Sequence, residues 1–183
     1  MAIKINKKIS FSLVSAVCLL WTQIMYSKSF DVFFIERNKN KNIVQYALNV
    51  DFDKCAPVSD EPGHAFWRNF EISPTDVESV GMFEKLAYGI KSQKVQKLKN
   101  GDYNVIMFLE ALPKRRIDIK IGKDENNKCS VVPFTTISDN TVIFTSVYVF
   151  AKERFALPPK VVYILLKGKS LDGKQASEKV LPD

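Results

Sequence analysis

The sequence is poor in the residue types that build catalytic and metal sites. Its 183 residues include one histidine, His64, and three cysteines. A zinc site takes three or four ligands from histidine, cysteine and carboxylates, so we expect no metal. A histidine-dependent hydrolase would have a single candidate base, and no G-x-S-x-G turn supplies a nucleophile. Glycine-rich phosphate loops and dinucleotide fingerprints are also missing, so no cofactor is expected.

Acidic residues are missing from the first thirty positions. Three lysines precede an apolar run over 9–25, and Ser27 and Ser29 stand at the −3 and −1 positions of a cut before Phe30. These features predict a Sec-type signal peptide over 1–29 and a periplasmic or secreted protein. The apolar run is shorter than the roughly 20 residues of a membrane-spanning helix. A membrane tether through an uncleaved signal anchor is the alternative.

The chain after the expected leader is nearly balanced in charge. Four of the 27 basic residues and none of the 20 acidic residues lie in 1–29, so residues 30–183 carry a net charge of +3 instead of +7. Binding to a nucleic-acid backbone needs a concentrated basic surface. We therefore expect no nucleic-acid partner, and we interpret the basic run 91–99 as a solvated strand or loop. Membrane contact is expected only through an uncleaved leader.

Residues 30–183 contain no internal repeat, low-complexity tract or linker, which predicts a single domain. Apolar and polar residues alternate in many short segments, as in strands that bury one face. The expected strands cover 31–37, 43–50, 64–71, 87–95, 103–109, 116–121, 129–135, 141–151 and 161–167. Strands at such short spacing indicate a mainly β fold, a single antiparallel β-sandwich or flattened β-barrel of about eight strands.

One α-helix is expected after the third strand. Ser73 is typical of an N-cap, Pro74 stands at the first helical position, and Asp76 follows three residues after the cap. Apolar residues then recur at helical spacing, at Val77, Val80, Phe83 and Leu86. We expect this apolar stripe to pack on the core.

The stretch NKNKN, Asn38–Asn42, separates two expected strands. Asparagine tolerates turn conformations, so the stretch predicts a five-residue hairpin loop whose asparagines can also bond a ligand. Arg37 ends an apolar strand face, where it either recognises a carboxylate or another anion, or stacks on a ring such as Tyr46. Trp67 and Tyr88 are likewise either ligand contacts or aromatic residues of the core and rim.

Two cysteines, Cys55 and Cys129, lie outside the expected leader. An even pair in an oxidising compartment predicts a disulfide, and both residues lie beside turn-like sequence. The alternative is two unpaired thiols on backbones too far apart to bond.

Six motifs follow one another along the chain in a specific order. They are FFIERNKNKNIVQYALN at 33–49, FW at 66–67, LAYG at 86–89, SVYVF at 146–150, KVVYILLKG at 160–168 and DGKQASEKVLP at 172–182. Together they resemble a bacterial family of short exported proteins, domain of unknown function family 4833. The resemblance implies one β-rich exported domain and brings no established activity.

The recurring polar, aromatic and glycine positions of that family would match Arg37, Asn38, Asn40, Asn42, Tyr46, Asn49, Trp67, Tyr88, Gly89, Gly168 and Glu178. This chain departs from the family pattern at Phe66, where a tyrosine or similar ring is usual. Cys55 and Cys129 do not belong to the pattern, so the expected disulfide would be particular to this protein.

Two functions of different class are consistent with these observations. The first is a non-catalytic module that binds a small molecule or an envelope protein, with a site drawn from Arg37, Asn38, Asn40, Asn42, Tyr46, Asn49, Trp67 and Tyr88. The second is a cell-envelope hydrolase or transferase that uses a carboxylate or His64 as its base. A third interpretation is a protein that docks a partner on an exposed strand edge. No catalytic residue is assigned.

Overall fold

The computed structural model describes residues 27–38, 40–73, 75–155 and 157–182. Within this part of the chain, twelve strands form one sheet, and a single short helix, α2, spans Lys85–Tyr88. The strands are β1 (Ser27–Arg37), β2 (Asn40–Asp51), β3 (Ala56–Pro57), β4 (Gly63–Arg68), β5 (Val77–Ser79), β6 (Ile90–Lys97), β7 (Tyr103–Leu109), β8 (Leu112–Lys123), β9 (Cys129–Ile137), β10 (Asn140–Arg154), β11 (Leu157–Lys169) and β12 (Gln175–Val180). The expectation of a mainly β fold is confirmed.

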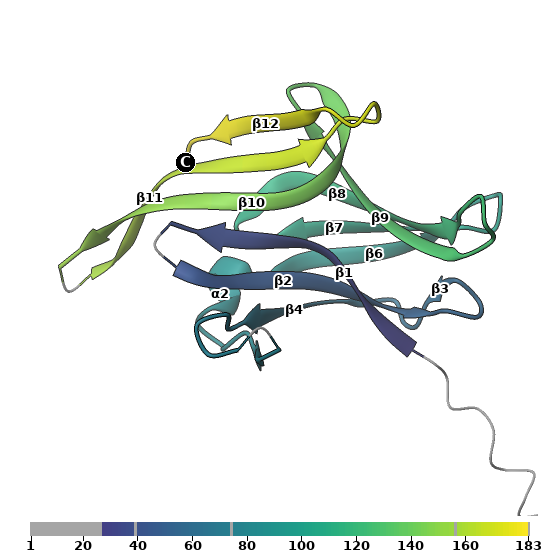
Figure 1. Ribbon diagram of the computed structural model, residues 1–183, viewed down its shortest axis with the longest axis horizontal. Helices are drawn as coiled ribbons and strands as arrows, with labels where there is room; N and C mark the ends of the chain where they lie inside the picture. The colour runs from purple at the N-terminus through teal and green to yellow at the C-terminus, as the bar shows by residue number, and fades with distance from the viewer. Residues whose placement is uncertain (1–26, 39, 74, 156, 183) are drawn as a thin grey trace, which may run out of the picture.

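The sheet runs in the order β5-β4-β2-β1-β10-β9-β8-β7-β6, with β11 beside β10, β12 beside β11 and β3 beside β2. Strand pairs are antiparallel except that β1 and β10 run parallel, with Phe34 opposite Ser146 and Arg37 opposite Val149. Figure 1 shows the sheet curling, so that β6, β7 and β8 lie behind β1 and β2. The expected sandwich or closed barrel of about eight antiparallel strands is therefore corrected to one open sheet of twelve.

The additional strands lie at the margins of the sheet. β3, β5 and β12 contain two, three and six residues, and none of their residues is fully buried. Strands that bury so little apolar surface leave only a weak alternation in the sequence. Their existence depends on pairing with a neighbour, which a local pattern does not reveal.

The core fills the inner side of the curled sheet. Alternate residues of each strand point inward, as the two-residue period of a strand requires. The fully buried side chains include Val44, Tyr46 and Leu48 of β2, Val105, Met107 and Leu109 of β7, and Ile117, Ile119 and Ile121 of β8. Burying one such aliphatic side chain contributes about 1.5–3 kcal/mol. This shared core holds the two ends of the sheet against each other.

One side chain connects the two ends of the curled sheet. The backbone N–H of Gly63 in β4 donates to Oε1 of Gln93 in β6 at 2.8 Å, and Nε2 of Gln93 donates to the Gly63 carbonyl at 3.2 Å. A Cβ at position 63 would lie 2.5 Å from Cε of Met107, so glycine allows this close approach. The Gln93 amide thus provides the contact between β4 and β6 that backbone hydrogen bonds would make in a closed sheet.

The expected helix beginning at Ser73 is wrong. Val77–Ser79 forms β5, which pairs with β4, and Pro74 lies outside the described residues. Phe83 and Leu86, expected in the core, are 80% and 78% exposed. Pairing with β4 prevails over an apolar spacing that resembles a helix, because tertiary contacts override local propensity.

The hairpin between β1 and β2 is tighter than expected. Arg37 pairs with Asn40, so Asn38 and residue 39 connect the strands, instead of the five residues 38–42. Asn42 accordingly belongs to β2. Residue 39 lies outside the described residues.

Residues 1–26 of the expected leader lie outside the described residues. The last three residues of that leader belong to β1, where Ser27 pairs with Asp51 and Ser29 pairs with Asn49. The cut before Phe30 stays a prediction. Within the described residues, no helix has the length and apolar character needed to cross a membrane.

The expected disulfide joins Cys55 to Cys129, with a Cα–Cα distance of 5.2 Å. Cys55 is buried, and its φ of 49° places it in the left-handed region of a turn. Asp51 supports this turn by accepting hydrogen bonds from the backbone N–H groups of Lys54 and Asp53. The bond from the Lys54 N–H, assisted by the Lys54 ammonium group, lowers the pKa of Asp51. The turn after β2 is thereby fixed to the start of β9.

Removing the disulfide is expected to lower the free energy of unfolding by up to about 4 kcal/mol, since it closes a long loop in the unfolded chain. The two cysteines are 74 residues apart in the sequence. Urea unfolding of the oxidised protein and of a Cys55→Ser/Cys129→Ser variant measures the difference. A reductant should lower the unfolding midpoint of the natural protein and leave that of the variant unchanged. Equal midpoints in the oxidised and reduced natural protein would contradict the expectation.

Replacing Gln93 by leucine is expected to cost about 1–3 kcal/mol, because the Gly63 N–H and carbonyl lose their partners between two packed strands. Gln96→Leu in the same strand is the matched control, because no hydrogen bond joins its side chain to the described residues. Hydrogen exchange of the Gly63 amide should accelerate in Gln93→Leu and remain slow in Gln96→Leu. Equal exchange in both variants would show that Gln93 does not hold the two edges together.

Candidate functional site

A polar pocket of about 360 Å³ lies beside the β1–β2 hairpin, β4, β5 and α2. It is lined by Arg37, Asn40, Asn42, Trp67, Asn69, Glu78, Glu84 and Tyr88. Five of these residues belong to the set predicted from the sequence, namely Arg37, Asn40, Asn42, Trp67 and Tyr88. The fold therefore brings a majority of the predicted residues to one concave place.

The two asparagines of the pocket present their amide N–H groups. Asn40 and Asn42 are two residues apart in β2, so both project from one face of the strand. Oδ1 of Asn40 accepts a bond from the Asn42 backbone N–H at 2.9 Å, and Oδ1 of Asn42 accepts one from the Glu71 backbone N–H at 3.1 Å. With both carbonyl oxygens engaged, the Nδ2 groups remain available as donors.

Arg37 supplies the positive charge of the pocket. Its side chain is half-buried at the end of β1, and it forms no hydrogen bond or ion pair within the described part of the chain. The ring of Tyr46, one partner that the sequence analysis considered, stacks on Phe33 instead, with ring centroids 4.7 Å apart. Because no described residue engages the guanidinium, its donors can contact a bound group.

Two glutamates and an asparagine form the acidic side of the pocket. Oε2 of Glu84 accepts hydrogen bonds from Nε1 of Trp67 at 2.9 Å and from the Gly81 backbone N–H at 2.8 Å. Nδ2 of Asn69 donates to Oε2 of Glu78 at 3.4 Å. Glu84 thus fixes the plane of the indole ring.

The aromatic wall of the pocket is Trp67 against Tyr88. Their rings meet edge to face, with centroids 5.4 Å apart and an interplanar angle of 73°. This is a favourable geometry for aromatic pairs. Both rings are half-buried, so the pair combines a rim position with a surface that a ligand can contact.

Asn69, Glu78 and Glu84 line the pocket but were not predicted from the sequence. Residues 73–86 were expected to be helical, and a helix there would have directed the Glu78 and Glu84 side chains differently. Glu78 enters the pocket because it pairs with Trp67 across β4 and β5. No local signal in the sequence identifies that pairing.

Tyr46, another predicted site residue, belongs to the core behind the pocket. Its side chain is fully buried, and its hydroxyl donates to the Tyr88 backbone carbonyl at 2.6 Å. Burial, reinforced by the nearby Tyr88, raises the pKa of Tyr46 well above its usual value, so the phenol keeps its proton. Tyr46 therefore positions α2 and does not itself line the pocket.

Asn38 and Asn49 also lie away from the pocket. The Asn38 side chain bonds the Ala151 backbone twice, donating from Nδ2 to the carbonyl at 2.9 Å and accepting from the N–H at 2.7 Å. Asn49 sits further along β2, where its backbone bonds Pro62 and Val58. Of the eight predicted residues, Asn38, Tyr46 and Asn49 do not line the pocket.

The family resemblance also marked Gly89, Gly168 and Glu178. The two glycines lie close to neighbouring backbone, and Glu178 forms an ion pair. A Cβ at Gly168 would lie 2.7 Å from the Ile143 carbonyl oxygen, and one at Gly89 would lie 2.4 Å from the Lys85 carbonyl oxygen. Glu178 pairs with Arg115 at 2.6 Å. These residues hold strands and α2 in place and lie outside the pocket.

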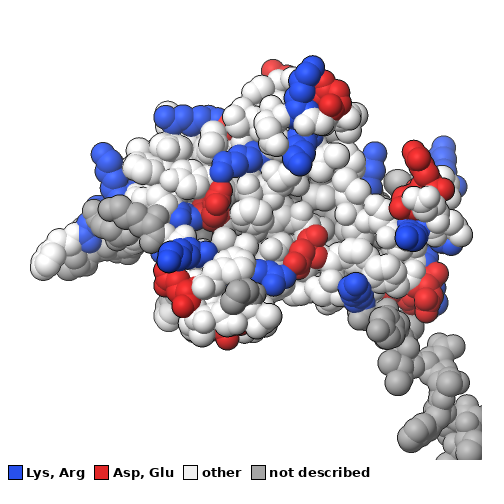
Figure 2. All heavy atoms as spheres, viewed as in Figure 1, with Lys and Arg blue, Asp and Glu red and all other residues white. Residues whose placement is uncertain are grey.

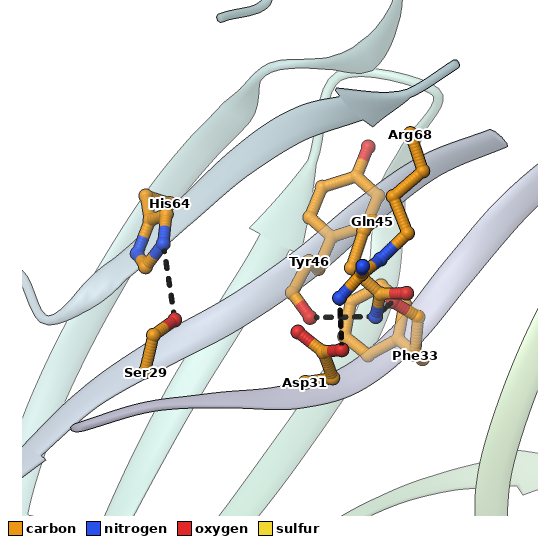
Figure 3. A network of polar contacts seen from close by, with 7 residues as sticks. All are labelled: Ser29, Asp31, Phe33, Gln45, Tyr46, His64 and Arg68. Carbon is orange, nitrogen blue, oxygen red and sulfur yellow. Dashed lines mark hydrogen bonds and ion pairs between the residues drawn. The ribbon is translucent and has the colours of Figure 1, made fainter. Parts of the chain in front are cut away.

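A second, larger concavity of about 680 Å³ lies on the outer face of β1 and β4. Figure 3 shows its two contacts, a bond of 3.3 Å between Nε2 of His64 and Oγ of Ser29 and an ion pair between Arg68 and Asp31. Nδ1 of His64 is buried and has no partner within the described residues. A serine–histidine pair needs a third group to orient the imidazole, and none of the described residues provides it.

Groups of three or more His, Cys, Asp or Glu residues able to hold a metal ion are missing from the described residues. The chemistry that the polar pocket offers is recognition. It combines one cation, amide donors, two carboxylates and an aromatic wall.

The comparisons with known proteins give one match. Residues 33–179 match the family described as Domain of unknown function (DUF4833), which covers most of the chain and every residue of the polar pocket. No curated protein and no solved structure matches. The resemblance noted in the sequence is confirmed, and the chain belongs to the family Domain of unknown function (DUF4833).

Proposed function

We propose that this protein is a non-catalytic module that binds a small zwitterionic molecule in the polar pocket. The ligand carboxylate would bind Arg37, and its ammonium group would face Glu78 and Glu84. The observation that carries the proposal is a half-buried guanidinium without a partner among the described residues, which lines the same pocket as two carboxylates.

The chemistry of each wall supports a ligand with both charges. A guanidinium binds a carboxylate through two parallel hydrogen bonds, which adds geometric specificity to the attraction. The Nδ2 groups of Asn40 and Asn42 can donate to the same carboxylate. A simple anion would bring a negative charge toward Glu78 and Glu84, whereas a zwitterion balances both sides of the pocket.

The size and the aromatic wall also favour a small ligand. A volume of about 360 Å³ lies at the lower end of the range of roughly 300–1,000 Å³ typical of small-molecule sites. Trp67 and Tyr88 provide an apolar surface of fixed orientation, since Glu84 holds the indole. A rigid wall lowers the entropy lost on binding.

The alternative function, a cell-envelope hydrolase or transferase, has weaker support. His64 belongs to the other concavity, and its partner Ser29 would be removed by the predicted cut before Phe30. The carboxylates near Arg37 are Glu78 and Glu84, and the latter already accepts two hydrogen bonds. We therefore assign no catalytic role to His64, Glu78 or Glu84.

The proposal places the module outside the cytoplasm, in the periplasm or in the medium. The Cys55–Cys129 disulfide supports this, because structural disulfides persist in oxidising compartments. The basic and apolar composition of the first 29 residues supports it independently.

Thermal unfolding with a panel of L-amino acids tests the ligand class. At a concentration of 100 times Kd, a ligand should raise the Tm by about 5–10 °C. The amino acid that acts should lose most of its effect as its amide, which lacks the carboxylate, and as its N-acetyl derivative, which lacks the ammonium group. A panel without any effect, or equal effects of all three forms, would refute the zwitterion proposal.

Variants of the same experiment separate the pocket from the rest of the predicted set. Arg37→Met should abolish the Tm increase, because it removes the cation and keeps a similar apolar stem. Asn49→Ala is the matched control, since Asn49 lies outside the pocket and should leave the increase unchanged. If Asn49→Ala abolished the Tm increase and Arg37→Met retained it, the ligand would bind outside the polar pocket.

Mass spectrometry of the native, non-reduced protein from cell fractions tests export. We expect a chain that begins at Phe30, with Cys55 and Cys129 oxidised, in the periplasmic or secreted fraction. A full-length chain in the membrane fraction would instead support the signal-anchor alternative. A full-length, reduced chain in the cytosol would overturn export altogether.

A further inference from the structure

β10 and β11 extend beyond the sheet as a two-stranded ribbon, residues 150–155 and 157–163, at the left of Figure 1. β10 pairs with β1 as far as Val149, and β11 pairs with β12 from Ile164 onward. Beyond these points the two strands pair only with each other within the described residues. The base of the ribbon is supported, because Ala151 is buried and Val161 packs against the core. The end of the ribbon is exposed at Phe155, and an isolated two-stranded hairpin is marginally stable.

The ribbon carries a net positive charge in its sequence. Lys152 lies directly opposite Lys160 across β10 and β11, and Arg154 follows two residues later. Like charges in directly opposite positions destabilise a strand pair. Residues 150–163 contain three basic residues and one acidic residue, and the sequence between Arg154 and Lys160 has no charged residue. An anionic partner would relieve the repulsion.

The end of the ribbon is apolar and aromatic. The Phe155 side chain is 100% exposed, the highest value for a large apolar residue among those described. At the base, Phe150 and Tyr163 stack with ring centroids 5.0 Å apart. On the face visible in Figure 2, basic side chains flank this end of the molecule, and the described atoms at its far left are white. Apolar tip, basic flank and aromatic base thus succeed one another along the ribbon.

The base of the ribbon is held firmly by the hairpin residue Asn38. Its backbone N–H donates to the Val149 carbonyl at 3.2 Å, and its side chain bonds Ala151 on both sides of the peptide. These contacts continue the β1–β10 pairing by one step after β1 has ended. The ribbon is thus presented in a defined direction.

We propose that the ribbon docks the protein on an anionic lipid surface. Phe155 enters the boundary of the acyl chains, and Lys152 and Lys160 contact the negative head groups. Exposed apolar residues beside basic ones bind membranes through apolar burial and attraction to anionic lipids. The aromatic base suits the polar–apolar interface. This site is distinct from the ligand pocket and does not depend on it.

Co-sedimentation of the purified protein with vesicles tests the proposal. Vesicles of phosphatidylcholine alone are compared with vesicles of equal parts phosphatidylcholine and phosphatidylglycerol. We expect binding to the anionic vesicles only, with a decrease as salt concentration rises. Phe155→Ser and Lys152→Glu/Lys160→Glu should each weaken binding by about tenfold or more. Because every variant is prepared identically, any contribution of residues 1–29 is common to all.

Two controls test whether the effect belongs to the ribbon. Leu171→Ser changes an exposed apolar residue at the other end of β11, and Lys91→Glu/Lys94→Glu reverses two exposed charges on β6. Both should bind as the natural protein does. Equal losses in the controls, or no preference for anionic vesicles, would overturn the proposal. So would a dimer in size-exclusion chromatography that ignores vesicles and dissociates with Phe155→Ser, since the occupant would then be a second copy.

Discussion

The described residues contain only the short helix α2, so no helical layer covers the sheet, and the sheet can bury one of its faces only by folding back on itself. The other features of this protein depend on that constraint. The inner residues of β2, β7 and β8, such as Leu48, Met107 and Ile119, are separated from water because the sheet curls around them. Curling brings β4 against β6, where the strands approach at Gly63 and the Gln93 side chain supplies the missing hydrogen bonds. Hydrophobic burial drives the closure of the sheet. The Gln93 amide provides hydrogen bonds to backbone groups that the closure would otherwise leave without partners.

The polar pocket follows from where this curled sheet stops. Beyond β4 lie β5, whose three residues are exposed, and the short helix α2, which has no buried residue, so within the described residues the core reaches this region only through Val80 and Tyr88. The buried Tyr46 reaches from the core to the Tyr88 carbonyl, and Glu84 holds Trp67, so the pocket has a rigid floor although its walls are short elements. Its charged groups lie at the margin of the sheet, where water screens them and burial costs little.

Sequence reasoning succeeded where a residue's own neighbours decide its conformation. Strand 103–109 was predicted to the residue, and the predicted strand 129–135 falls within β9. It failed where a distant partner decides. Val77 and Val80 fit a helical spacing, yet Val77 lies in β5 and pairs with Arg68 of β4. Of the apolar residues in the expected helical stripe, only Val80 is buried. Glu78 and Glu84 were missed with that helix, whereas Arg37, Asn40 and Asn42 were found because the family resemblance marked them.

The hairpin that contains the stretch NKNKN therefore has two structural roles, one for each of its sides. Asn40 and Asn42, with Oδ1 atoms tied to the backbone, direct their amide donors into the pocket beside Arg37. Asn38 turns the other way and fixes the Ala151 peptide at the base of the ribbon. Because Arg37 pairs with Asn40 in the hairpin, a displacement of the turn would move both the pocket cation and the Asn38 clamp. Tight turns resist such displacement, since few residues can take up the change in backbone angles. The short connection between β1 and β2 thus gives a polar site and a projecting ribbon the same rigid support.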